Sequence, residues 1–171
     1  MLAKAREKCA LLPNVTIARD DFRTFNLDRT FDTVVCASNS MNYVEGVADL
    51  TGVVRRVAAH LEPGGLFVFD AITEVDRRML SGHYLHATVG DRRFAMRFAY
   101  DPITRRETTT VLLPTGVEVH RRVPIDPPGV KAALAAGLQV FDYFSTAMVP
   151  GWWRVWGTCF YVLVKRSPRD R

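Results

Sequence analysis

The chain has 171 residues, of which 48% are apolar and 24% charged, a composition typical of one globular domain and not of a disordered chain. No apolar run reaches the roughly 18 residues that a membrane-spanning helix needs, and no signal-peptide core stands at the N-terminus, so we expect a cytoplasmic protein with no membrane partner. The net charge of +5 comes largely from scattered arginine pairs without a nucleic-acid-binding module, so we expect no nucleic-acid partner.

The first elements are a helix and two short strands. MLAKAREKC (1–9) has apolar residues at spacings of three and four, which predicts a helix, although no capping residue precedes it. VTIA (15–18) is a short β-rich run, and FDTVVCAS (31–38) has the nearly continuous apolar character of a strand buried on both faces. We therefore expect two strands after the opening helix.

A second helix and a third strand follow. Residues 47–61 carry an apolar stripe at helical spacing. This helix is expected to end at EPGG (62–65), because proline cannot continue it and glycine permits a reversal. LFVFDAI (66–72) is again of strand length. The alternation of strands with helical crossovers indicates a parallel α/β sheet.

The pattern then changes to a period of two. FAMRFAY (94–100), ETTTVLL (107–113) and VEVHRRV (117–123) are separated by short turns that contain proline. Such a pattern predicts an antiparallel β-meander. We interpret residues 83–123 as an inserted meander, or lid, within a single domain that spans residues 1–171.

The last segments return to the α/β pattern. PGVKAALAAG (128–137) predicts a short helix, LQVFDYFSTA (138–147) a strand, and CFYVLVKR (159–166) a last strand. The last two strands should pair antiparallel because no helix links them. The loop between them contains Trp152, Trp153 and Trp156. These rings either cover the sheet edge, line a substrate mouth or form a dimer contact.

Four stretches resemble the second half of a class I S-adenosylmethionine-dependent methyltransferase of the small-molecule type. MLAKAREK is similar to the helix after the family's second strand, and RDDFRTF to the turn after the third. FDTVVCASNSMNYV resembles the fourth strand and its loop, and LEPGGLFVFD resembles the LxPGGxxxxD segment that leads into the fifth. The resemblance implies an α/β fold: an incomplete Rossmann-like methyltransferase sheet with an antiparallel last strand and an inserted antiparallel β-meander.

The sequence departs from this family at its start. The Gly-rich loop after the family's first strand and the acidic residue that ends the second strand are absent, so we expect roughly the first third of an enzyme to be missing before Met1. The resemblance implies a truncated methyltransferase with weak or no binding of its cofactor, S-adenosylmethionine. Its ancestral activity would be N- or O-methylation of a small-molecule acceptor.

Two other functions stay open beside methyl transfer. A non-catalytic methyltransferase-like fragment could act as an interaction or oligomerisation module, with a homodimer as one outcome, because an unpaired strand edge invites a partner. A nicotinamide-dependent oxidoreductase fits the sheet, but it needs a GxGxxG loop that the sequence lacks. Whether the chain is an active enzyme is not decided by its residues.

The resemblance implies a cofactor site beyond the carboxyl ends of the strands. Asp21 would accept a hydrogen bond from the adenine amino group and the Phe22 amide would face the ring nitrogen. Asp20 competes for the first role, and a turn-capping carboxylate is the other interpretation of Asp21. The backbone groups expected to face the methionine part and the reacting methyl belong to Cys36, Ala37 and Ser38.

Acceptor-binding residues are expected in the loop after that strand and at the end of the next one. They are Asn39, Met41, Asn42, Tyr43 and Asp70, with loop capping and, for Met41, core packing as the alternatives. His120 and Tyr43 are the catalytic candidates, because histidine can take a proton from an amine or hydroxyl. His83 and His86 are weaker candidates on an expected loop, and Asp32 is expected to be structural.

The three cysteines offer no further chemistry. Cys9, Cys36 and Cys159 show no CxxC spacing and no histidine partner at metal-ligand distance. We therefore expect reduced thiols, two of them in strand-like apolar runs, and no metal site.

Overall fold

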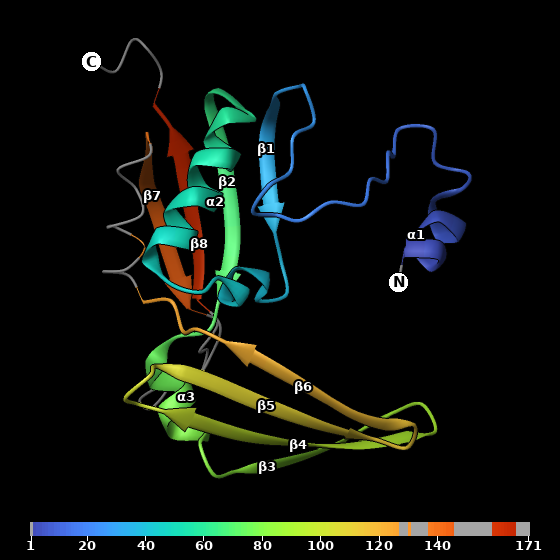
Figure 1. Cartoon of the computed structure of the whole chain (residues 1–171). Coiled ribbons are helices and arrows are strands. Elements are labelled where there is room, and N and C mark those ends of the chain that lie inside the picture. The colour runs from blue at the N-terminus through green and yellow to red at the C-terminus, as the bar shows by residue number, and fades with distance from the viewer. Residues whose placement is uncertain (1, 127–129, 131–136, 146–158, 167–171) are drawn as a thin grey trace.

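Two four-stranded sheets make up the described part of the chain (Figure 1). The computed structural model describes residues 2–126, 130, 137–145 and 159–166. The helix expected over 128–137 falls outside these residues except at Val130 and Gly137, and the three tryptophans fall outside them entirely. None of the described helices is long and apolar enough to cross a membrane.

The first sheet has the strand order β1-β2-β8-β7. Its strands are β1 (Phe31–Cys36), β2 (Leu61–Ala71), β7 (Leu138–Ser145) and β8 (Cys159–Lys165). β1 and β2 are parallel, whereas β8 is antiparallel to both of its neighbours. The predicted mixed sheet with an antiparallel last strand is therefore confirmed. Its consequence for a site is that β1 and β2 end at the same edge.

Helix α2 (Val47–Ala59) lies across one face of this sheet and supplies much of the core (Figure 1). Four side chains of the apolar stripe that the sequence predicts are at most 3% exposed: Leu50, Val53, Val54 and Val57. These side chains belong to the same buried cluster as Phe67 and Phe69 on β2. Removal of this apolar surface from water holds the helix on the sheet.

The connection from α2 to β2 differs from the expectation. The helix ends at Ala59 and β2 begins at Leu61, so EPGG lies inside the strand and does not follow the helix end. In the pairing register Leu61 faces Phe31 and Leu66 faces Thr33, which sets five steps on β2 against two on β1. Such a bulge accommodates a proline, because the bulged residues leave the ladder.

The second sheet is antiparallel throughout, with the order β3-β4-β5-β6. Its strands are β3 (Tyr84–Val89), β4 (Arg92–Asp101), β5 (Arg106–Leu113) and β6 (Gly116–Arg122). The three predicted meander strands are present, and β3 is a fourth. His86 therefore lies on a strand, so its expected place on a loop is wrong. Helix α3 (Glu74–Leu80), which begins at a Thr73–Asp76 capping box, connects β2 to this sheet.

The segment before β1 contains one helix and no strand. Helix α1 (Leu2–Cys9) is present as predicted, but none of its described residues is buried, and it stands apart from both sheets in Figure 1. Residues 15–18, expected as a strand, have no strand conformation. A strand requires a neighbour that takes up its backbone hydrogen bonds. Among the described strands, β1 pairs with β2 and none pairs with 15–18.

Candidate active site

The carboxyl ends of β1 and β2 are joined through one loop contact. The Asn39 amide donates a 2.9 Å hydrogen bond to Oδ1 of Asp70, which is 9% exposed. Ser38 and Asn39 have φ values of 64° and 56°, in the left-handed region that non-glycine residues seldom adopt. Such backbone strain is often found at functional sites. Asp70 thus holds the loop that leads into the short 3₁₀ helix η1 (Ser40–Tyr43).

Cys36, the last residue of β1, is not a nucleophile at neutral pH. Burial, with a smaller contribution from the negative charge of Asp70, raises the pKa of its thiol to about 11. All three cysteines are half-buried and none forms a disulfide. The role expected for Cys36, through its backbone, does not require a thiolate.

Asp20, Asp21 and Phe22 line a cavity of about 700 Å³ whose apolar walls include Val15 and Phe25. Oδ1 of Asp21 accepts a 2.9 Å hydrogen bond from the Arg23 amide, so the turn-capping role of this carboxylate is present in the structure. Asp21 remains exposed, with 54% of its side-chain surface accessible. The turn therefore fixes the carboxylate at the mouth of the cavity.

Arg23 ties this turn to the loop after β1. Its Nη2 donates a 3.1 Å hydrogen bond to the Tyr43 carbonyl, and its Nε lies 3.5 Å from Oδ2 of Asp49 on α2. The residues expected to bind adenine and those expected to bind the acceptor therefore lie on segments that contact each other. Arg23 has no role that its sequence context indicates, because nothing in its spacing points to a partner twenty residues away.

Met41 and Asn42 are fully buried, each 0% exposed, so neither presents a side chain to a ligand in this structure. Met41 belongs to the core, which is the alternative that the sequence left open. The Asn42 amide nitrogen donates to the Ile72 carbonyl at 3.0 Å and the Val123 carbonyl at 2.8 Å, and its oxygen accepts from the Ile72 amide at 2.9 Å. Asn42 thus joins η1 to both sheets, and the expected acceptor contact is corrected to a bracing role.

The two catalytic candidates, Tyr43 and His120, lie in contact. The Tyr43 hydroxyl is 2.6 Å from Nδ1 of His120, although the residues are 77 positions apart in the chain. On the other side of the ring, Nε2 lies 3.7 Å from Oε2 of Glu118. Tyr43 and the His120 side chain are each 37% exposed. The hydroxyl of Tyr43, the imidazole of His120 and the carboxylate of Glu118 therefore lie in a row in space, where the two sheets meet.

A buried ion cluster supports the strand that carries His120. Glu107 on β5 is 0% exposed. It accepts hydrogen bonds from Nε and Nη2 of Arg122 at 2.9 and 3.2 Å and from Nη1 of Arg77 on α3 at 3.5 Å. Thr109 lies between them, bonded to both Glu107 and Arg122. Glu107 and Arg122 are not among the residues expected to have a role, although their places on one face of an alternating meander are a sequence signal for such a pair.

His83 and His86 do not join this arrangement. His86 pairs with Ala95 and so faces the opposite side of the sheet from His120, because side chains alternate along each strand. His83 precedes β3 and is exposed. Of these three histidines, His120 is the one that contacts Tyr43 in the loop after β1.

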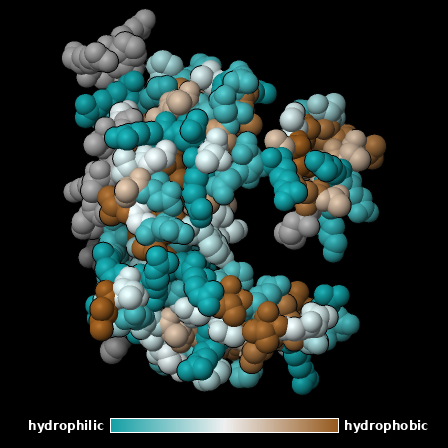
Figure 2. All heavy atoms as spheres, viewed as in Figure 1, coloured by the Kyte–Doolittle hydropathy of each residue, from teal (hydrophilic) through white to brown (hydrophobic). Residues whose placement is uncertain are grey.

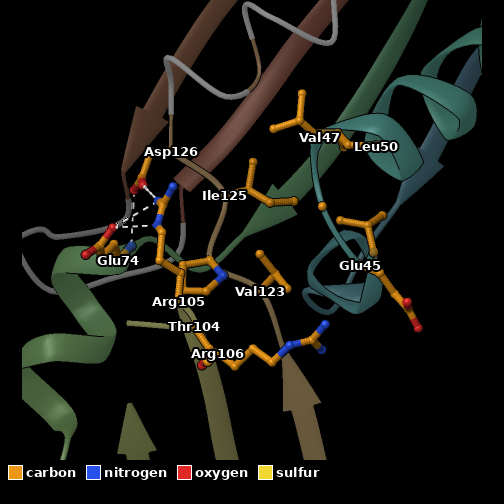
Figure 3. A pocket seen from close by; sticks show the side chains of 13 residues that line it. Glu45, Val47, Leu50, Glu74, Thr104, Arg105, Arg106, Val123, Ile125 and Asp126 are labelled. Atoms are coloured by element: carbon orange, nitrogen blue, oxygen red, sulfur yellow. Dashed lines mark hydrogen bonds and ion pairs between the residues drawn. The ribbon is translucent and has the colours of Figure 1, made fainter. Parts of the chain in front are cut away.

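A second cavity, of about 610 Å³, lies between α2 and the end of the meander (Figure 3). Figure 3 shows Val47, Leu50 and Ile125 as its apolar wall and Arg105 opposite them. The Arg105 guanidinium is already paired with Glu74 at 2.9 Å and Asp126 at 2.8 Å. None of the residues that the sequence predicts to bind cofactor or acceptor lines this cavity. We therefore place the candidate site at Tyr43, His120 and the ends of β1 and β2.

The first 65 residues match a family described as a methyltransferase domain. Over 70 residues, 41% of this chain, the sequence is 39% identical to a dTDP-3-amino-3,4,6-trideoxy-alpha-D-glucopyranose N,N-dimethyltransferase of Streptomyces venezuelae. That match covers 28% of the relative, and the chain spans about a quarter of the length of each curated relative it matches.

Solved structures resemble almost the whole chain. An S-adenosylmethionine-dependent methyltransferase from Clostridium acetobutylicum superimposes with a TM-score of 0.78 at 18% identity, covering 97% of this chain and 71% of that one. An amino pentose methyltransferase from Micromonospora echinaspora, solved with S-adenosylmethionine bound, gives a TM-score of 0.67 at 28% identity, covering 96% and 69%. These likenesses confirm the Rossmann-like methyltransferase fold that the sequence indicates.

Proposed function

The chain is related to the class I S-adenosylmethionine-dependent methyltransferases, and on this premise we propose that it N-methylates a small-molecule amine. The contact between Tyr43 and His120 supports this most directly, since it sets a proton acceptor beside the edge where β1 and β2 end. The curated relatives are N,N-dimethyltransferases of dTDP-linked amino sugars, which favours nitrogen over oxygen as the methylated atom. A cytoplasmic location belongs to the same proposal.

The residues around the larger cavity fit the adenosyl part of the cofactor. Its walls combine the rings of Phe22 and Phe25 with the carboxylates of Asp20 and Asp21, which suit an apolar heterocycle with an exocyclic amino group. Asp21 would accept from that amino group, and the Phe22 amide would face the ring. The backbone of Cys36, Ala37 and Ser38 would lie along the methionine part. When bound, S-adenosylmethionine supplies a methyl group on a sulfonium, so the protein chiefly provides position and a dry site.

Proton transfer from the acceptor falls to Tyr43 and His120. An ammonium has no lone pair, so the acceptor nitrogen must lose a proton before it can take the methyl group that bound S-adenosylmethionine would supply. The Tyr43 oxygen takes that proton and passes its own to Nδ1 of His120, across the 2.6 Å contact. The imidazolium then directs its Nε2 proton toward Glu118, 3.7 Å away, which stabilises the charge.

Two substitutions test this function. Tyr43→Phe and His120→Asn should each reduce transfer of a labelled methyl group to a dTDP-linked amino sugar or a simple amine by about 100-fold, the usual size of a general-base contribution. His86→Asn, on the opposite face of the same sheet, is the matched control and should leave the rate unchanged. A His120→Asn variant that is as active as the parent chain would overturn the assignment. Calorimetric titration of S-adenosylmethionine with Asp21→Asn tests the cofactor residue independently, and an unchanged affinity would exclude it.

A non-catalytic interaction module is the second candidate, favoured by one observation. The edge of β1 away from β2 has no strand partner within the described residues, and Val35 on that strand is 65% exposed. An open strand edge is a template for pairing with another chain. Light scattering separates the two functions. A stable homodimer that binds no S-adenosylmethionine would favour the module, and a cofactor-binding monomer would favour the enzyme.

A further inference from the structure

The two faces of the second sheet differ, and the face that carries His120 is apolar away from the junction. The register pairs Leu85 with Met96 and Met96 with Val111, so these three side chains form one row across the sheet. A second row, at Ala87 and Phe94, lies further along. We define the apolar floor as five apolar side chains of this face: Leu85, Val89, Phe94, Met96 and Val111. Figure 2 shows hydrophobic side chains in brown gathered over this part of the molecule.

The floor is more exposed than Phe98, which lies on the same face near the junction. Near the junction Phe98 is 9% exposed, because Arg77 of α3 lies over its ring at 5.5 Å. Further out, Leu85 is 48% and Val89 67% exposed, and the other members are half-buried. Contiguous exposed apolar surface of this kind marks a binding surface in soluble proteins.

The floor is continuous with the candidate active site. His120 pairs with Thr109, which pairs with Phe98, and the neighbouring row is Glu118, Val111 and Met96. One step of the alternating register, two residues or about 7 Å, therefore separates His120 from the floor. A molecule whose reacting nitrogen meets Tyr43 would extend over Val111 and Met96.

Charge on this face does not suit a nucleoside diphosphate. Among the described residues of this face the arginines are Arg92 and Arg122, and Arg77 of α3, which lies over Phe98, is paired with Glu107. Arg122 is held by Glu107 and Thr109, and Arg92 stands at the far end of β4, beside the hairpin turn. The carboxylate of Glu118 lies 3.7 Å from Nε2 of His120, so the charge beside His120 on this face is negative. A diphosphate placed over the floor would lose hydration without gaining a cationic partner.

From these observations we infer that the floor binds the apolar body of the acceptor, and that the acceptor is an amine carried on an apolar ring system or chain and not on a nucleoside diphosphate. This inference rests on the proposed function, since it places the reacting nitrogen at Tyr43 and His120. It sets this chain apart from the curated relatives, which are named for dTDP-linked sugars. The partly exposed Glu118 would then face the ammonium of an incoming amine.

Binding of a defined probe tests the inference without methyl transfer. The probe is 4-phenylbutylamine, and its affinity is compared with that of a dTDP-linked amino sugar by NMR titration of the labelled methionine methyl groups. We expect the Met96 methyl signal to shift with 4-phenylbutylamine and to shift little with the nucleotide sugar. Met96→Gln should weaken probe binding by about tenfold, the factor expected when a methionine loses much of its apolar contact.

Leu112→Gln is the matched control, because Leu112 follows Val111 on β5 but faces the other side of the sheet and is 46% exposed. It should leave probe binding within twofold, and circular dichroism should show both variants folded. Equal binding of the probe by Met96→Gln and the parent chain would overturn the inference, as would tighter binding of the nucleotide sugar. A dimer that Met96→Gln converts to a monomer would also overturn it, because a second copy would then occupy the floor. If the probe binds as expected but accepts no methyl group, the proposed methyl transfer is contradicted, whereas binding of an apolar amine on the floor is supported.

Discussion

Asn42 and Ile72 exchange two hydrogen bonds, with the side-chain oxygen of Asn42 accepting from the Ile72 amide at 2.9 Å and its nitrogen donating to the Ile72 carbonyl at 3.0 Å. The same nitrogen also donates to Val123 at 2.8 Å. One buried amide therefore links the loop after β1 to the ends of β2 and β6. Because Tyr43 follows Asn42 directly, and His120 precedes Val123 by three residues, this link sets the distance between the two catalytic candidates.

Replacement of Asn42 tests that link. Asn42→Ala leaves buried backbone groups at Ile72 and Val123 without their partner, so we expect a loss of about 2–3 kcal/mol in the free energy of unfolding. Urea denaturation followed by circular dichroism measures it. Asn26→Ala, at an exposed residue that bonds only to Asp28 across the surface, should change stability by less than about 0.5 kcal/mol. Equal midpoints for the two variants would contradict the bracing role.

Removal of the charge on Glu107 should be more damaging. Glu107→Gln leaves two largely buried guanidinium groups, on Arg77 and Arg122, without a compensating carboxylate. We expect destabilisation by about 3–5 kcal/mol, since an unpaired buried charge is costly. Arg78→Gln, which breaks the surface pair with Glu74, is the control and should cost less than about 1 kcal/mol. A Glu107→Gln chain as stable as this control would show that water reaches the cluster.

The Cys36 thiol should be almost inert at physiological pH. With a pKa of about 11, about one thiol in a thousand is ionised at pH 8, whereas an ordinary thiol of pKa near 8.5 is ionised at the level of about one in four. Alkylation by iodoacetamide should therefore be more than 100-fold slower than for a free thiol and should rise tenfold per pH unit up to pH 10. The rate is measured on a chain with Cys9 and Cys159 replaced by serine. A plateau below pH 9 would mean that burial does not suppress ionisation.

Two glycines should respond in opposite directions to alanine. A Cβ at Gly65 would lie 2.9 Å from the Glu62 carbonyl oxygen and 3.0 Å from that of Asp32, so Gly65→Ala should destabilise the bulged start of β2 by about 1–3 kcal/mol. Gly52 lies in the middle of α2 with open space where its Cβ would be, so Gly52→Ala should stabilise the chain by about 0.5–1 kcal/mol. Thermal unfolding of both variants measures the difference. A reversed order of melting temperatures would contradict the register of β1 and β2.

Local patterns were sufficient to predict most of the fold. The stripe on α2 and the period-two strands of the meander each follow from spacing within one segment, and the antiparallel last pair follows from a connection with no helical pattern. The strand predicted for VTIA is wrong because a strand depends on a neighbouring strand, and the composition of the segment does not show whether one is present. EPGG failed because a proline and two glycines suit a bulge as well as a helix end, and only the register with β1 separates these two.

The candidate site was predictable in its members and not in their roles. Tyr43 and His120 were singled out separately, but no spacing indicates that residues so far apart meet. Asn42 is expected at the acceptor from its place in the loop after β1. The sequence does not show whether its amide bonds to a ligand or to backbone groups. Burial decides between these uses, and burial depends on how the sheets pack.

The entry to the second sheet and the exit from it lie side by side. Ile72, where the chain leaves β2, accepts a 3.0 Å hydrogen bond from the amide of Ile125, where the chain returns after β6. Residues 73–124 are therefore joined covalently to the rest of the chain at two adjacent points. Inserted segments with adjacent ends are replaceable, because the host needs no rearrangement to accept a different one. Replacement of the residues between Ile72 and Ile125 by the corresponding segment of a relative should thus be tolerated. The acceptor preference of the relative should pass to the chimeric chain.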